Sequence, residues 1–135
     1  EIRSVGYNSF VRGWNDDDPK NHERPYKYEI TEHSERNSFY NAIRSGVSLK
    51  GCKIYVPWYP CCDCARGIVQ SGLTEVILHK EYPSDINNKW TDSQQVAVDI
   101  LRQGGVKVRS WSGVIPEITG RLNGKIIYPT RFSDD

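Results

Sequence analysis

The sequence predicts a three-layer α/β domain with a largely parallel sheet, and three observations support this. Short apolar segments alternate with segments of helical periodicity along most of the 135 residues. The segment Glu75–Ser110 has the pattern strand, helix, strand, which is typical of a right-handed parallel crossover. With 37% hydrophobic and 26% charged residues and no repeat, the composition is that of one globular domain.

The first quarter of the chain contains a short predicted strand and a loop. Ile2–Tyr7 has the apolar character of a strand. The polar stretch Trp14–Pro25 carries two prolines and three aspartates. We interpret those aspartates as a solvated loop rather than a cation site.

The next segment predicts a helix over Thr31–Arg44. Thr31 would be its N-cap, with Glu32 and Glu35 in the first turns, and Gly46 would end it. An apolar stripe recurs at four-residue spacing: Phe39, Ile43 and Val47.

The second half of the chain alternates strands and helices. In order, we expect a buried strand, a helix, a strand, a helix and a strand at Cys52–Val56, Cys61–Ser71, Glu75–His79, Asp92–Gln103 and Val106–Ser110. Gly72 and Gly104-Gly105 would end the two helices, and Val96, Ile100 and Leu101 would face the core. In the tail, Gly113 to Asp135, the pair Asn123-Gly124 between apolar flanks predicts a hairpin.

Charge and composition exclude several classes of function. A net charge of +1 argues against a large nucleic-acid footprint, although one or two arginines could hold a small anion. No apolar run could span a bilayer and no signal peptide is visible, so no membrane partner is expected. The chain has no methionine, which indicates that an N-terminal part has been removed or is absent from the sequence.

The cysteines indicate metal binding. Three of the four, Cys61, Cys62 and Cys64, fall within four residues, whereas a disulfide framework would spread them out. Such clustering favours a reducing compartment, the cytoplasm.

Two short motifs carry the chemistry, His33-Ser34-Glu35 and Pro60-Cys61-Cys62-Asp63-Cys64. Cys61 and Cys64 share one face at a helix start, where the helix dipole favours thiolates, and His33 starts another helix. Three ligands predict one Zn²⁺ per chain with its fourth position open to water, which marks a catalytic site. Glu35 could move protons to and from that water.

Alternatives remain for the cysteine motif taken alone. A C-x-x-C pair could be a redox pair or half of a structural zinc site, with Cys62 or Cys52 as the fourth ligand. Cys62 fits poorly because it points about 100° away from Cys61 on a helix. Cys52 begins a strand and is expected in the core.

At these residues the chain resembles the cytidine/deoxycytidylate deaminase superfamily, whose signature is H-x-E followed by P-C-x-x-C. The resemblance implies that His33, Cys61 and Cys64 bind zinc and that Glu35 is the catalytic proton shuttle. It also implies that the backbone N–H groups of Ser34 and Cys61 bind the pyrimidine carbonyl. Ser34 stands where the family usually has alanine.

The deoxycytidylate (dCMP) deaminase branch is the most similar one. The stretch Gly6–Gly13 (GYNSFVRG) is similar to that branch's G-Y-N-G-x-P-R-G, with Ser9 and Val11 as departures. The resemblance implies that Asn8 contacts the sugar 3′-hydroxyl and that Arg12 and Arg24 bind the 5′-phosphate. It places Tyr59 near the pyrimidine ring.

The resemblance also implies the fold and the partners. We expect a cytidine-deaminase-like domain over residues 1–135, its first helix missing, with helices on both faces of a mixed, mostly parallel sheet of about five strands. The helix Asp92–Gln103 separates the chain from the free-cytidine deaminases, which lack it. A homo-oligomer, namely a hexamer, and dCTP and dTTP as effectors are implied as well.

The expected reaction is hydrolysis of dCMP to dUMP and ammonia. Alternative substrates are dCTP, 5-substituted dCMP, cytosine, guanine, tRNA adenosine and an antibiotic. A non-catalytic zinc-binding module is the alternative of a different class, and Glu35 argues against it.

Overall fold

The computed structural model describes residues 1–80, 92–116, 119–122 and 125–127. By its internal contacts the chain divides into two compact units, Glu1–Lys50 and Gly51–Asp135. The single domain over 1–135 stays a prediction. Among the described helices, none combines the length and the apolar character needed to cross a membrane.

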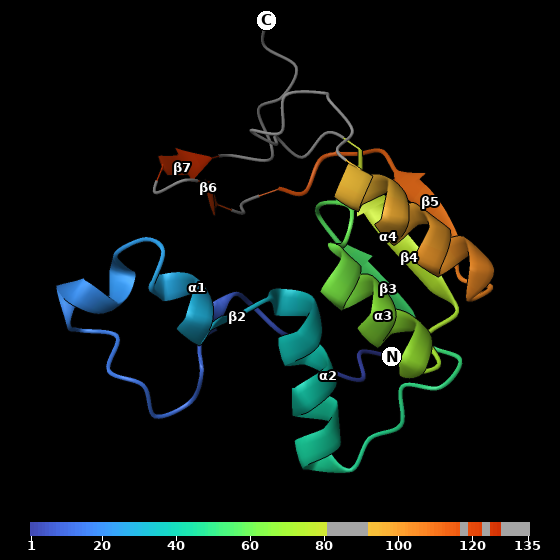
Figure 1. Ribbon diagram of the computed structural model, residues 1–135. Coiled ribbons are helices and arrows are strands. Elements are labelled where there is room, and N and C mark those ends of the chain that lie inside the picture. The colour runs from blue at the N-terminus through green and yellow to red at the C-terminus, as the bar shows by residue number, and fades with distance from the viewer. Residues whose placement is uncertain (81–91, 117–118, 123–124, 128–135) are drawn as a thin grey trace, which may run out of the picture. The chain divides into compact units, whose positions relative to one another are not determined.

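The first unit contains two short strands and three helical segments. Its elements are β1 (Ser9–Phe10), the 3₁₀ helix η1 (Pro19–His22), α1 (Lys27–Ile30), β2 (Thr31–Glu32) and α2 (Ser34–Ser45), labelled in part in Figure 1. Strands β1 and β2 pair antiparallel. The predicted loop from Trp14 to Pro25 is confirmed apart from the single turn η1.

The predicted strand Ile2–Tyr7 does not form. Its carbonyl groups bond side chains of α2 instead of a neighbouring strand, since Asn41 Nδ2 donates to Val5 O and Asn37 Nδ2 donates to Tyr7 O, both at 2.8 Å. Ser4 Oγ also donates to Ser38 O at 2.7 Å. We call residues 4–12, which run from this contact to Arg12, the N-terminal strap.

The start of α2 lies three residues beyond the predicted one. Thr31 belongs to β2, where it pairs with Phe10, and its hydroxyl donates to Lys27 O at 2.6 Å. The N-cap of α2 is therefore His33 rather than Thr31. Glu32 precedes the helix and Glu35 lies in its first turn.

The buried face of α2 differs from the predicted stripe. Phe39 and Ala42 are buried, whereas Ile43 is 71% exposed. Because successive helical residues turn by about 100°, a face centred between Phe39 and Ala42 leaves Ile43 outside it. The predicted end is confirmed: Gly46 adopts the left-handed conformation (φ 66°), and its N–H bonds the carbonyls of Ala42 and Ile43.

The second unit is built on a parallel sheet. Its main elements are β3 (Lys53–Val56), α3 (Cys62–Gln70), β4 (Glu75–His79), α4 (Asp92–Gln103) and β5 (Lys107–Trp111), in the strand order β3-β4-β5. The predicted bounds of β4 and α4 are confirmed, and the other three elements differ from theirs by one residue at one or both ends. Strand β3 lies at the edge, so it alternates between exposed and covered residues and is not buried throughout as predicted.

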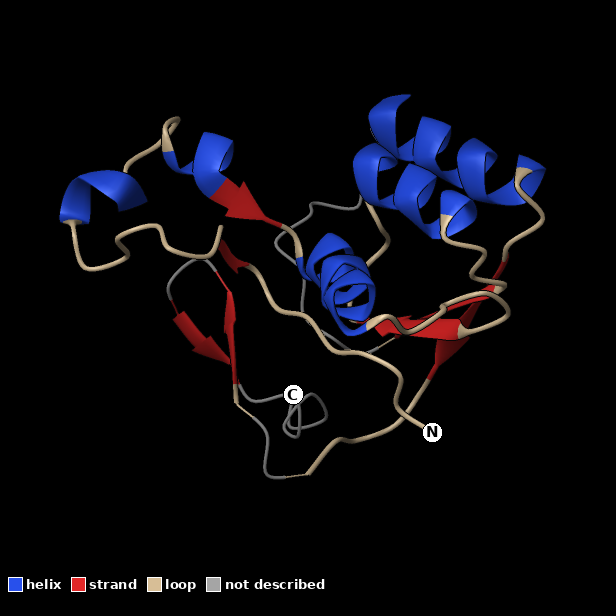
Figure 2. Ribbon diagram, turned by 90° about the horizontal axis from the view of Figure 1, so that it is seen from below, coloured by secondary structure: helices blue, strands red, loops and turns tan. Residues whose placement is uncertain are grey.

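Both helices of this unit lie side by side over one face of the sheet (Figures 1 and 2). Two right-handed crossovers that step in the same direction place their helices on the same face. The core between the two helices and the sheet includes Ile68 of α3, Val76 of β4 and Leu101 of α4, all fully buried. On α4 the buried partner of Leu101 is Ala97, whereas Val96 is 50% exposed and was wrongly predicted to face the core.

The α/β class is confirmed, with a smaller parallel sheet than expected. Three described strands form it rather than about five, and the other described strands form two antiparallel pairs. One of these pairs is β6 (Gly120–Leu122) with β7 (Lys125–Ile127), which confirms the hairpin in the tail. Its turn, Asn123-Gly124, lies outside the described residues.

Candidate metal and substrate site

In the first unit, His33 and Glu35 are placed at the start of α2. His33 has the extended backbone of an N-cap (φ −73°, ψ 151°). The Ser34 hydroxyl donates to Glu35 Oε2 at 3.1 Å, which orients this partly buried carboxylate. A carboxylate in the first turn is also stabilised by the helix dipole. The imidazole and the carboxylate are thus held two residues apart at one helix end.

In the second unit, Cys61 and Cys64 occupy the start of α3. Cys61 is the N-cap (φ −69°, ψ 171°) and Cys64 is fully buried. Cys62 is turned toward α4, where its sulfur lies 3.0 Å from Ser93 O. The helix therefore separates Cys61 and Cys64 from Cys62, as the sequence predicts.

The metal-binding candidates form one group. Among the residues that the structure describes, the His, Cys, Asp and Glu side chains that group as a metal site are His33, Cys61 and Cys64. One imidazole and two thiolates are a donor set that suits zinc, and three protein ligands leave one tetrahedral position open. These are the three residues that the sequence predicts, and in the part of the chain that the structure describes neither Cys52 nor Cys62 belongs to the group.

Asn8 of the N-terminal strap contacts the same helix start. Its Oδ1 accepts a hydrogen bond from the backbone N–H of Ser34 at 2.7 Å. The NH₂ of the Asn8 side chain, which can donate two hydrogen bonds, thus remains available to bind a hydroxyl group. The same bond occupies the Ser34 N–H. For this N–H to bind a pyrimidine carbonyl as predicted, Asn8 Oδ1 would have to be replaced by the carbonyl oxygen as its acceptor.

The two arginines predicted to bind phosphate have different surroundings. Arg12 donates from Nη2 to Asn41 Oδ1 on α2. Arg24 lies over the ring of Tyr28, with its guanidinium carbon 5.7 Å from the ring centroid. Arg12 is thereby tied to α2, the helix that His33 caps and that contains Glu35, whereas Arg24 contacts an aromatic ring of α1. Burial raises the pKa of Tyr59, so this phenol stays protonated at neutral pH.

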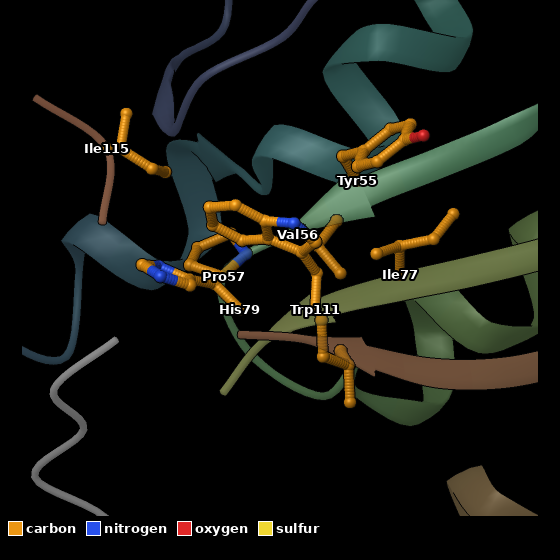
Figure 3. A pocket seen from close by; sticks show the side chains of 8 residues that line it. Tyr55, Val56, Pro57, Ile77, His79, Trp111 and Ile115 are labelled. Carbon is orange, nitrogen blue, oxygen red and sulfur yellow. The ribbon is translucent and has the colours of Figure 1, made fainter. Parts of the chain in front are cut away.

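A separate pocket in the second unit does not suit a nucleotide. Its volume is about 260 Å³. It is lined by Tyr55, Val56, Pro57, Ile77, Leu78, His79, Trp111 and Ile115 (Figure 3). None of the predicted site residues lines it, and no Lys or Arg is present to bind a phosphate. The imidazole of His79, its most polar group, is bonded through Nε2 to Gly113 O at 2.7 Å.

Two functional candidates were missed in the sequence, Asn37 and Asn41. Both connect α2 to the N-terminal strap, and Asn37 also donates to Ser9 Oγ at 3.1 Å. Asparagine is disfavoured in helix interiors because its side chain competes for the hydrogen bonds of nearby backbone groups. Two asparagines one turn apart in a predicted helix could therefore have indicated side chains that bond another segment.

Comparison with known proteins places this site in a family. Residues 4–80 match the family model described as the cytidine and deoxycytidylate deaminase zinc-binding region. A protein of Aliivibrio fischeri named uncharacterized deaminase in luxG 3′ region is 37% identical over 107 residues, 79% of this chain and 69% of that protein. The deoxycytidylate deaminase of phage T4 is 38% identical over 76 residues, 56% of this chain and 35% of that enzyme.

More distant relatives agree in name and fold. Mouse deoxycytidylate deaminase is 29% identical over 83% of this chain and 62% of its own length. The structure of the dCMP deaminase of cyanophage S-TIM5, in complex with dCMP and dUMP, superimposes with a TM-score of 0.61 at 23% identity, covering 82% of this chain and 74% of that one, and supports the fold.

The alignments span less than two thirds of the mouse and phage T4 enzymes. The family model nevertheless covers more than half of this chain and includes the histidine, the glutamate and both cysteines of the motifs. The chain therefore belongs to the cytidine and deoxycytidylate deaminase family, to whose zinc-binding region residues 4–80 correspond.

Proposed function

We propose that the chain is a hydrolytic deaminase of dCMP, producing dUMP and ammonia. The observation that carries the proposal is the donor group of His33, Cys61 and Cys64, together with a carboxylate, Glu35, two residues from the histidine. Both lie within the zinc-binding region shared with the family. A purely structural metal site has no use for a carboxylate beside it.

The three donors would hold one Zn²⁺ with an open position. Zinc bound there would supply the nucleophile at neutral pH, because it lowers the pKa of bound water to about 7. Cys61 and Cys64 begin a helix whose dipole favours their thiolate form, the form that binds the metal.

Glu35 would move the protons of the reaction. In the overall change, the C4–NH₂ bond of the cytosine breaks, a C4=O bond forms from water, and ammonia leaves. The Glu35 carboxylate would accept a proton from the attacking water and deliver it to ring N3. It would then accept the proton of the new C4–OH group, as the C4=O bond forms, and pass it to the leaving amine. The hydrogen bond from the Ser34 hydroxyl supports this role because it orients Oε2 without supplying a counter-charge.

The N-terminal strap would select a deoxynucleotide. Asn8 would donate from its amide to the sugar 3′-hydroxyl, and Arg12 would bind the 5′-phosphate by paired, charge-assisted hydrogen bonds. Relatives from mouse and phage T4 are named deoxycytidylate deaminases, which favours the same substrate here. Arg24 as a second phosphate ligand, Tyr59 beside the ring, and the Ser34 and Cys61 N–H groups as carbonyl donors belong to the same proposal.

The remaining expectations stay predictions. A homo-oligomeric hexamer and dCTP and dTTP as effectors rest on the family resemblance, and a cytoplasmic location rests on the clustered cysteines.

Ammonia release by the zinc-loaded protein tests the reaction. We expect kcat/KM for dCMP to exceed that for deoxycytidine by at least ~10²-fold, since one or two charge-assisted bonds to phosphate are each worth about 1.5–3 kcal/mol. The panel includes dCTP, 5-methyl-dCMP, cytosine and guanine. Equal rates on dCMP and deoxycytidine would exclude a phosphate site and with it the dCMP assignment.

Glu35→Gln tests the proton shuttle, and we expect it to retain zinc while losing at least ~10²-fold in turnover. Glu29→Gln is the matched control, because Glu29 is an exposed glutamate of α1. Near wild-type turnover in the zinc-loaded Glu35→Gln protein would rule out the shuttle.

A further inference from the structure

Asn41 joins two parts of the N-terminal strap to helix α2. Its Nδ2 donates to Val5 O at 2.8 Å, while its Oδ1 accepts from Arg12 Nη2. One amide therefore anchors both the beginning of the strap and the guanidinium near its end. Arg12 itself is an exposed residue, so this bond is what restricts its side chain to the surface of α2.

The strap that carries Arg12 is fixed at several further points. Ser9 and Phe10 pair with β2, and the Val11 N–H donates to Ile30 O at 3.0 Å. Asn8 bonds the Ser34 N–H at the start of α2. The backbone before Arg12 is thus held by β2, by the last residue of α1 and by the start of α2, the helix that carries Glu35.

The partner of Arg12 is unusual for this chain. Among the described residues, five other arginines pair with carboxylates: Arg3, Arg36, Arg66, Arg102 and Arg109. Arg12 is bonded to a neutral amide instead, and the described residues give it no carboxylate within ion-pair distance. Its positive charge is oriented but not neutralised.

We propose that Asn41 is a positioning residue that holds Arg12 ready for the substrate phosphate without cancelling its charge. This inference rests on the proposed function. A carboxylate at the same place would fix the guanidinium equally well, but it would occupy the donors and repel the incoming phosphate. An amide oxygen accepts one hydrogen bond and leaves the other guanidinium N–H groups to a bidentate contact.

Two substitutions at one position separate charge from geometry. Asn41→Asp and Asn41→Ala both remove the donor to Val5 O, but only the aspartate neutralises Arg12. We expect Asn41→Asp to lower the ratio of kcat/KM for dCMP to that for deoxycytidine by about ten- to a hundred-fold, mainly through KM, because a charged hydrogen-bonding partner of the phosphate is lost. Asn41→Ala should lower the ratio less.

A matched control and a double variant complete the experiment. Asn21→Asp introduces the same charge and removes the same kind of bond, since Asn21 Nδ2 donates to Asn15 O at 2.6 Å without an arginine partner. It should leave the ratio unchanged. In an Arg12→Ala background, Asn41→Asp should have little further effect on the ratio, because its action would pass through Arg12.

Binding of the product provides a second measurement that does not depend on turnover. Calorimetry of the zinc-loaded protein should show that Asn41→Asp weakens the binding of dUMP more than the binding of deoxyuridine. If the aspartate and alanine variants instead affect nucleotide and nucleoside alike, Asn41 has a structural role only and the inference is wrong. If the unsubstituted protein itself does not prefer dCMP to deoxycytidine, the proposed function fails first, and the two failures are thereby distinguished.

Discussion

Gly6 should be required for the packing of the N-terminal strap on α2. A Cβ atom at this position would lie 2.3 Å from Ser34 O and 2.4 Å from Ser38 N, both of them backbone atoms of the helix. Ordinary contacts of a Cβ atom begin at 3.4 Å, so that Gly6→Ala would push the strap outward by about 1 Å. The backbone of a helix cannot move aside as the end of a flexible side chain can.

The displacement allows an estimate of the cost. The bonds from Asn37 to Tyr7 O and from Asn41 to Val5 O, both 2.8 Å long, would stretch beyond hydrogen-bonding distance. Two lost bonds at about 1 kcal/mol each agree with the 1–3 kcal/mol typical of overpacking. We therefore expect Gly6→Ala to lower the free energy of unfolding by about 2 kcal/mol.

Urea unfolding followed by tryptophan fluorescence measures this loss, and the dCMP-to-deoxycytidine ratio measures its consequence for the site. Gly46→Ala is the control: its φ of 66° imposes backbone strain, but its Cβ would meet no atom within 4 Å. It should cost about 1 kcal/mol and leave the ratio intact. A Gly6→Ala protein with wild-type stability and selectivity would show that the strap does not pack on α2 as described.

Three further predictions concern the sheet and the metal. Glu75, buried on β4, bonds Lys53 at 3.0 Å and Arg109 at 2.6 Å, and these two partners hold its pKa below the ordinary value of 4.5. A carboxylate with a depressed pKa in the folded state stabilises the fold at pH values above its unfolded-state pKa. Glu75→Gln should therefore lower the urea midpoint at pH 7, and the difference from the unsubstituted protein should disappear as the pH falls through the depressed pKa. An unchanged midpoint at pH 7 would contradict this ion-pair assignment. Elemental analysis should find about one zinc per chain in the Cys62→Ser protein and a large loss in Cys64→Ser, and equal zinc contents would argue against the ligand assignment. Chelation should abolish ammonia release and added zinc should restore it, whereas activity that survives complete removal of zinc would exclude a catalytic metal.

Local patterns predicted the second unit well. Strand β4 and helix α4 have the predicted bounds because each is a short periodic segment ended by clear chain signals. The face of α4 was less predictable. Val96 and Ala97 are neighbours, and in the helix that packs on α3 the smaller Ala97 is buried while Val96 is half exposed.

Two of the errors in the first unit have a common cause. Ile2–Tyr7 has the composition of a strand, but the carbonyl groups of Val5 and Tyr7 are bonded by asparagines 36 and 30 positions later. Such bonds leave no local periodicity in the strap itself. The same applies to Thr31, which has the chemistry of an N-cap but pairs with Phe10 in β2.

The candidate metal ligands could be proposed from the sequence because zinc chemistry restricts both residue type and spacing. Histidine, glutamate and the C-x-x-C pair at two helix starts leave few alternatives. Asn41 was not predictable in this way, since its proposed role depends on Arg12, and no sequence spacing connects the two residues. Positioning residues that act through another side chain are visible only once the contacts are known.

The way in which the strap is anchored also determines which of its positions can vary. Val5 and Tyr7 offer their carbonyl oxygens to α2, while their side chains are 68% and 75% exposed. Any residue has that carbonyl, so these two positions can accept substitutions of size or polarity without losing an anchor. Between them, Gly6 can accept none, because its missing side chain is what allows the backbones to meet. Libraries that diversify the positions on either side of Gly6 could therefore tune solubility or add a label while the approach of Asn8 and Arg12 to the helix is preserved.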